Sequence, residues 1–145
     1  MLTVYCDTGA YLRELAALEK SGCIQLVQWK YENKNDKIRV LAPPSKPTWE
    51  QAKVTWEQLR QMVWSDLSRQ SEKWPELIKL IGAGHRVDAQ HLDSAFMAQC
   101  DAFLTTDKDD ILRFRDEIES LLEFRVFHIP SEWEQFASYA AKGND

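Results

Sequence analysis

Short apolar runs alternate with amphipathic segments along most of the chain, and this alternation constrains the fold more than any other feature. The runs are rich in β-branched and aromatic residues and are bounded by turn residues, as is typical of buried strands. We expect strands at about 2–6, 23–29, 100–106 and 124–129. Because strands that alternate with helices form a mostly parallel sheet with helices on its faces, the sequence predicts a three-layer α/β/α sandwich around four to five strands.

The segments between these strands show helical spacing of apolar residues and recognisable helix ends. A first helix is expected within residues 10–22, which end in a helix-terminating glycine. Thr48 and Gln51 form a capping box at the start of a long helix that reaches Val63. Residues 30–47 are polar and then rich in proline, and are expected to be a loop with at most a short helix or hairpin. Four more helices are expected, one starting at Pro75, one over 88–99, one over 108–122 and one opened by Pro130 and Ser131.

Size and composition indicate a single globular domain over residues 1–145. The chain is 44% hydrophobic and 28% charged, shows no internal repeat, and is expected to be frayed at about 142–145. It has no apolar run near the roughly 20 residues that cross a bilayer, and its N-terminus lacks the basic region of a signal peptide. Three cysteines without a Cys-x-x-Cys pair favour reduced thiols and a cytoplasmic location. The net charge of −5 argues against indiscriminate binding of polyanions.

Carboxylates from distant parts of the chain are expected at one edge of this sheet. Asp7 directly follows the first strand and Asp107 follows the third, while Asp88 opens the helix that leads into the third strand. In such sheets ligands gather outside the carboxyl ends of the strands, where the crossover helices also begin. Glu32 comes a few residues after the second strand, and we expect it at the same edge.

The chemistry of such a cluster points to a hard divalent cation. Two like charges about 4 Å apart repel by roughly 4 kcal/mol at an effective dielectric near 20, so the acids stay ionised only beside a cation, unless one protonates. Carboxylate oxygens without a His/Cys cluster suit Mg²⁺ or Mn²⁺ rather than Zn²⁺. Since such an ion activates water and holds a phosphate oxygen, the sequence predicts metal-assisted hydrolysis of a phosphodiester.

Three segments resemble those of the PIN-domain nucleases. "VYCDTGAY" resembles the opening strand of that family, which ends in Asp-Thr-Ser. "HRVDAQHLDSAFMAQCDAFLTTDKDDIL" is similar to the later block, in which Asp-x-x-His-Leu-x-x-Ala precedes a strand ending in Thr-Thr-Asp-Lys-Asp. "LVQWKYENKNDK" is similar to the segment in which a glutamate follows strand two. The likeness runs from residue 2 to about 129, and it is strongest over 85–112.

The resemblance implies a metal-dependent endoribonuclease that hydrolyses RNA, like the toxins of VapC type. Such toxins are usually encoded beside an antitoxin protein that plugs the acidic groove, and they commonly form homodimers. Carried over by position, the catalytic and metal-binding quartet would be Asp7, Glu32, Asp88 and Asp107. Thr8 or Thr106 would support these ligands by hydrogen bonds, and Asp110 would be a fifth acid.

The sequence also departs from the family pattern. Gly9 stands where the family usually has serine, which removes one hydroxyl near the site. The loop 33–47, with its "LAPPSKP", is individual to this chain and would alter substrate access or the surface that meets a partner.

Each of these residues also has an ordinary structural interpretation. Asp88 could be only a helix N-cap, and Asp107 could cap the helix that follows it, where further acids favour the helix dipole. Glu32 could be a solvated side chain of a polar segment. His91 could touch substrate or orient the acid, although a packing role with one hydrogen bond is more usual.

One cluster of basic residues lies beside Glu32 in an otherwise acidic chain. It could contact RNA phosphates, or it could belong to a solvated loop. Its members are Lys30, Lys34, Lys37 and Arg39.

Three other functions compete with the nuclease. A phosphatase of the haloacid dehalogenase type also places an aspartate after strand one, but needs a second acid where this chain has Gly9. A receiver domain needs a phosphoacceptor aspartate that ends a middle strand near residue 55, where a helix is expected. A catalytically inactive PIN-like module that binds RNA or protein is the alternative outside the enzymes.

Overall fold

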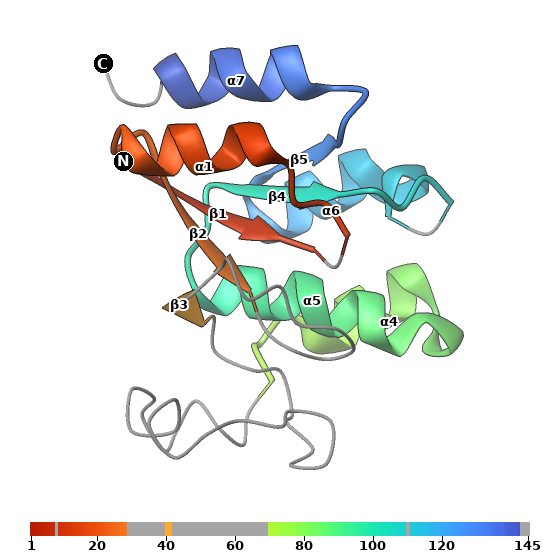
Figure 1. Cartoon of the computed structure of the whole chain (residues 1–145). Coiled ribbons are helices and arrows are strands. Elements are labelled where there is room, and N and C mark those ends of the chain that lie inside the picture. The colour runs from red at the N-terminus through yellow and green to blue at the C-terminus, as the bar shows by residue number, and fades with distance from the viewer. Residues whose placement is uncertain (8, 29–39, 42–69, 110, 143–145) are drawn as a thin grey trace.

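The computed structural model describes residues 1–7, 9–28, 40–41, 70–109 and 111–142. These residues form a five-stranded sheet in which every pairing is parallel, in the order β3-β2-β1-β4-β5 (Figure 1). The strands are β1 (Leu2–Cys6), β2 (Ile24–Gln28), β3 (Val40–Leu41), β4 (Ala102–Thr105) and β5 (Arg125–His128). The parallel sheet predicted from the alternation of strands and helices is therefore confirmed.

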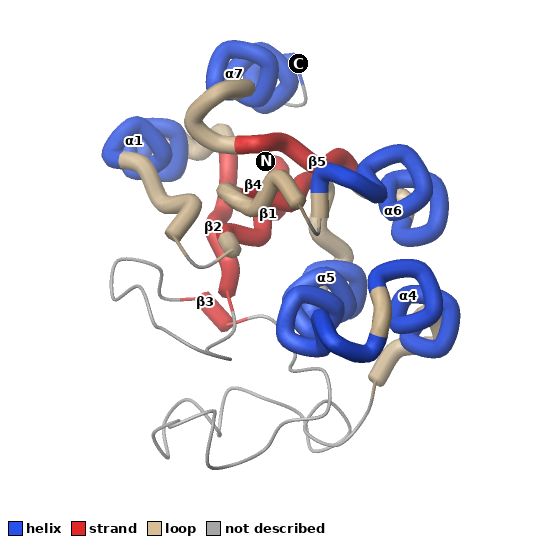
Figure 2. The backbone as a smooth tube through the Cα atoms, turned by 90° about the vertical axis from the view of Figure 1, so that its right-hand side faces the viewer, coloured by secondary structure: helices blue, strands red, loops and turns tan. Residues whose placement is uncertain are grey.

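Helices cover both faces of the sheet, as expected for a three-layer sandwich. Helices lie on either side of the sheet in Figures 1 and 2. The first face carries α1 (Arg13–Lys20) and α7 (Trp133–Lys142). The second carries α4 (Trp74–Ile81), α5 (Arg86–Met97) and α6 (Arg115–Leu122), and short 3-10 turns at Ala83–His85 and Leu112–Phe114 lead into α5 and α6.

Alternation along the central strand separates two hydrophobic cores. Val4 and Cys6 belong to the core under α1 and α7, which also holds Phe136. Tyr5 points the other way, into the core shared with α4, α5 and α6, and stacks on Phe103 of β4 with ring centroids 5.2 Å apart. Because successive strand residues point to opposite faces, the side chain two residues after Tyr5 is directed to the α5 side.

The structure differs from the sequence-based expectation in two places. Within residues 30–47, expected to be a loop with at most a helix or hairpin, Val40 and Leu41 form an edge strand parallel to β2. The helix expected over 108–122 begins only at Arg115, after a turn at 108–109 and the 3-10 turn. The helix expected from Thr48 to Val63 lies outside the described residues.

Two further observations concern membrane-spanning helices and disulfide bonds. Across the described part of the chain, no helix is both long and apolar enough to cross a membrane. The three cysteines all lie in that part, and none of them forms a disulfide.

Candidate functional site

The sheet has a topological switch point between β1 and β4. From β1 the chain moves outward to β2 and β3, and later returns to the other side of β1 to form β4 and β5. In open parallel sheets this arrangement leaves a crevice outside the carboxyl ends of the two strands, where ligands bind. Asp7 follows β1 directly and Asp107 comes two residues after the end of β4, so both acids lie at the switch point.

Asp7 is buried, 8% exposed, and its carboxylate contacts side chains of β4 and α5. Its backbone N–H continues the β1–β4 ladder by donating to the carbonyl of Leu104 at 2.9 Å. The Thr105 hydroxyl donates to Asp7 Oδ2 at 3.0 Å. On the other side, His91 Nε2 lies 3.6 Å from Asp7 Oδ1, which is beyond hydrogen-bond distance.

Thr105 connects the two acids at the switch point. Its side chain is completely buried. While its hydroxyl donates to Asp7, the same oxygen accepts the backbone N–H of Asp107 at 3.0 Å. A hydroxyl has one donor and two acceptor positions, so both bonds form together. The turn that carries Asp107 is thus tied to the Asp7 carboxylate through one oxygen atom.

His91 reaches the site from α5 and is only 2% exposed. Its Nδ1 lies 2.6 Å from the hydroxyl of Tyr5, and the two rings meet edge to face. His91 therefore has the buried, hydrogen-bonded environment of a packing residue, and its second ring nitrogen also faces Asp7.

Asp88 lies one helical turn before His91, in the first turn of α5. Its side chain is 26% exposed, and its Oδ2 lies 3.9 Å from Nδ1 of the more exposed His85. The N-cap interpretation of Asp88 is wrong, because the N-cap position of α5 is His85, three residues earlier.

Asp107 does not serve as a helix cap either. Ile111 and Phe114 occupy the cap positions of the 3-10 turn and of α6, so that interpretation is also wrong. Asp107 is half-buried. Neither Asp88 nor Asp107 therefore occupies a helix-cap position.

Among the described residues, the hydroxyl that supports Asp7 is that of Thr105. Thr106, one of the two candidates from the resemblance, is exposed, and the other, Thr8, lies outside the described residues. Gly9 has φ of +84°, a left-handed conformation that favours glycine, which accounts for the departure from serine at this position. A Cβ on Gly9 would lie 3.8 Å from the Thr106 hydroxyl.

Several expected site residues fall outside the described part of the chain. They are Thr8, Glu32, Asp110 and the basic cluster of Lys30, Lys34, Lys37 and Arg39.

Cys6, next to Asp7, is not an activated thiol. Burial, and then the charge of Asp7, raise the pKa of Cys6 to about 12. Since the thiolate is the reactive form, Cys6 is not a candidate nucleophile.

The donor types at the carboxyl edge suit a hard cation. Asp7, Asp88 and Asp107 supply carboxylate oxygens, the ligands that Mg²⁺ and Mn²⁺ prefer. As the side chains stand, no group of three or more His, Cys, Asp or Glu within the described residues is assembled to hold a metal ion. The chain thus fits such an ion in donor chemistry and in fold position, and the closed cluster expected from the sequence is not formed by these side chains.

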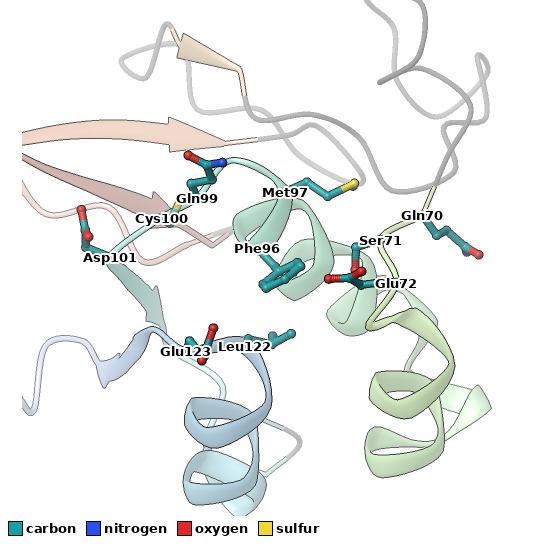
Figure 3. A pocket seen from close by; sticks show the side chains of 10 residues that line it. All are labelled: Gln70, Ser71, Glu72, Phe96, Met97, Gln99, Cys100, Asp101, Leu122 and Glu123. Atoms are coloured by element: carbon teal, nitrogen blue, oxygen red, sulfur yellow. The ribbon is translucent and has the colours of Figure 1, made fainter.

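A hollow of about 600 Å³ lies at the opposite edge of the sheet (Figure 3). Residues just before β4 and β5 line it, together with the end of α5 and residues 70–72. The charged side chains of its lining are all acidic, namely Glu72, Asp101 and Glu123. Because it lies at the amino ends of the strands, it is separate from the switch point.

Two residues of the site were missed by sequence reasoning. Thr105 was hidden as an ordinary last residue of a strand, and Tyr5 as a core aromatic. The period of two along a strand places Tyr5 and Asp7 on one face, but it identifies neither role, because Thr105 meets Asp7 only through the β1–β4 register, where it comes next after the Cys6–Leu104 pair.

Comparisons with protein-family models, with curated proteins and with solved structures found no match.

Proposed function

We propose that the protein is a metal-dependent endoribonuclease that hydrolyses RNA phosphodiester bonds at the carboxyl edge of the sheet. Asp7, Asp88, Asp107 and Glu32 are its proposed catalytic and metal-binding residues. One observation above all supports this: Thr105 ties the Asp7 carboxylate to the turn of Asp107 across the β1–β4 switch point. The Asp107 backbone N–H makes this bond, and it fixes the turn that carries the second acid at the end of β4, next to Asp7 on β1.

The described acids have different proposed roles at the site. When bound, Mg²⁺ or Mn²⁺ supplies Lewis-acid activation of water and of a phosphate group. Asp7 is fixed in place by Thr105 and faces His91, so its carboxylate needs little reorganisation to bind a cation. Asp88 and Asp107 are more open to solvent, and they are the acids that an RNA phosphate and its cation can approach.

The partners follow from the resemblance to VapC-type toxins and belong to the same proposal. They are an antitoxin protein that covers the acidic edge and a second copy of this chain in a homodimer. Lys30, Lys34, Lys37 and Arg39 are the proposed contacts to RNA phosphates, because they form a local basic cluster in a chain of net charge −5. A cytoplasmic location agrees with the absence of disulfides among the three cysteines.

The test is cleavage of a structured RNA by the purified protein, with Mg²⁺ and with a chelator. We expect products only with the metal, and restoration of cleavage when Mn²⁺ is added back after chelation. Asp7→Asn should abolish the products, whereas Asp109→Asn, which changes an exposed acid of the same turn, should leave them. Cleavage that persists in chelator would contradict the metal-dependent mechanism, and metal-independent RNA binding without products would identify a binding module instead.

A further inference from the structure

We propose that Tyr5 and His91 act as positioning residues for Asp7, with the Tyr5 hydroxyl donating to His91 Nδ1 so that the Nε2–H of His91 points at Asp7 Oδ1. The structural part of this inference stands on its own contacts, and its consequence for metal binding rests on the proposed function. Neither residue is expected to touch the RNA, because both are buried.

The side chains of Tyr5 and His91 are in direct contact. Tyr5 Oη and His91 Nδ1 are 2.6 Å apart, and Tyr5 is completely buried beneath α5. A neutral imidazole has one donor and one acceptor nitrogen, and a phenol can either donate or accept. Two arrangements therefore satisfy this contact, and they place the ring proton of His91 on different nitrogens.

The negative charge of Asp7 favours one of these two tautomers. His91 Nε2 lies 3.6 Å from Asp7 Oδ1, and both side chains are buried. If Nδ1 carried the proton, the Nε2 lone pair would face the carboxylate, a repulsion that the low dielectric of the interior strengthens. If Nε2 carries the proton, the same contact is attractive, Nδ1 becomes the acceptor, and Tyr5 is the donor.

With this tautomer, both oxygens of the Asp7 carboxylate face a donor group. One carboxylate oxygen accepts from Thr105, and the other is faced by the His91 N–H. The Thr105 hydrogen bond fixes one oxygen, the attraction of the His91 N–H at 3.6 Å favours the same orientation of the carboxylate, and each oxygen keeps an acceptor position for a cation. Because Nε2 is protonated, His91 does not act as a nitrogen ligand, and the metal site keeps the all-oxygen character that suits Mg²⁺ and Mn²⁺. Groups behind the ligands orient them in this way in many metal sites.

The decisive experiment is the tautomer of His91, read from long-range ¹H–¹⁵N correlations of the ¹⁵N-labelled full chain without metal. We expect a protonated Nε2 and an unprotonated Nδ1 in the wild-type protein. Tyr5→Phe, which removes only the hydroxyl, should keep the proton on Nε2, because Asp7 still selects it, and should shift the Nδ1 resonance, because Nδ1 loses its donor. The matched control is Tyr139→Phe, which removes a hydroxyl bonded to the Asp101 carbonyl at the opposite edge and should leave His91 unchanged.

A proton on Nδ1 in the wild-type protein would overturn the inference, and this reading requires no variant to fold. An unchanged His91 spectrum in Tyr5→Phe would overturn the role of Tyr5.

The effect of Tyr5 on metal affinity is measured by calorimetric titration with Mn²⁺ alone. Tyr5→Phe should weaken Mn²⁺ binding about tenfold, within the range seen when supporting residues of metal sites are changed. At saturating Mn²⁺ the turnover of RNA should approach that of the wild type, because the chemistry of Asp7 is unchanged.

Equal Mn²⁺ affinities in the two proteins would contradict the positioning role. If the wild type has the expected tautomer and cleaves no RNA, the proposed function fails while the arrangement of Tyr5 and His91 stands. If it cleaves RNA with the proton on Nδ1, the arrangement of Tyr5 and His91 fails while the proposed function stands.

Discussion

The two edges of the sheet each hold an aspartate beside the β1–β4 pair, but the two aspartates have different kinds of partner. At the amino edge, the Asp101 carboxylate accepts the backbone N–H of Thr3 at 2.9 Å. Its backbone also bonds to Thr3 and Arg125, so that it joins the starts of three strands. At the carboxyl edge, the Asp7 carboxylate contacts the side chains of Thr105 and His91.

This difference separates acids that bind backbone groups at strand ends from an acid whose carboxylate contacts side chains. An acid that accepts backbone N–H groups satisfies the end of a strand, and its own charge is used there. Glu132, just after β5, is of this structural kind even though it lies at the carboxyl edge, because it binds Arg115 and the backbone N–H of His128. The type of partner, together with the edge, singles out Asp7.

After Asp7 itself, the largest expected effect comes from Asp107, the second acid at the switch point. Asp107→Asn removes one charge from the proposed cation site, and we expect RNA cleavage to fall by about 100-fold or more, roughly 2.7 kcal/mol in the barrier. The backbone N–H that binds Thr105 is retained, so the unfolding midpoint should barely change. Rates measured beside the Asp109→Asn control test this, and equal rates in the two variants would break the distinction between the edges.

The complementary change is made at the amino edge. Asp101→Ala leaves the Thr3 N–H without its acceptor, and we expect the free energy of unfolding to fall by about 1–3 kcal/mol. Cleavage of RNA should remain near the wild-type rate. Urea unfolding and the cleavage assay on the same preparation measure both quantities; a loss of cleavage without a loss of stability would reverse the roles assigned to Asp7 and Asp101.

A smaller effect is expected at Thr105, which links the acids without belonging to them. Thr105→Val keeps the shape of the side chain and removes the shared hydroxyl, so the Asp7 carboxylate loses a donor and the turn of Asp107 loses an acceptor. We expect cleavage to fall about tenfold, near 1.4 kcal/mol. The exposed neighbour provides the control, and Thr106→Val should behave like the wild type.

The smallest effect concerns the pH dependence of the structural acid Glu132. Burial would raise its pKa, but hydrogen bonds from Arg115 and from the His128 backbone outweigh burial and lower the pKa below the usual 4.5. A lowered pKa means that this stabilisation is fully present above about pH 4.5 and is lost as the pH falls through the folded-state value.

We expect Glu132→Gln to cost about 1 kcal/mol at pH 7, because solvent screens the pair. The difference from the wild type should shrink in acid. Chemical denaturation from pH 7 to pH 3 measures it, and a gap that widens in acid would contradict the sign.

The sequence predicted the layers of the fold and the strand ends better than the contacts of the site. Strand and helix periods are local, so the position of Asp7 after β1 and of Asp107 after β4 could be read directly. The two-residue strand β3 is too short to show a period, and it owes its form to pairing with β2. Thr105 and Tyr5 acquire their roles only from the β1–β4 register and from the packing of α5, which no local pattern encodes.

A crystal structure of the protein grown with Mn²⁺, with anomalous scattering used to locate the ion, would decide whether the carboxyl edge binds a metal. We predict an ion at the carboxyl edge that is bound by an oxygen of Asp7 and shares its ligands with Asp107, with Thr105 still bonded to Asp7. A structure that holds Mn²⁺ only elsewhere, such as the acidic hollow at the amino edge, or that shows no ion at millimolar Mn²⁺, would contradict it.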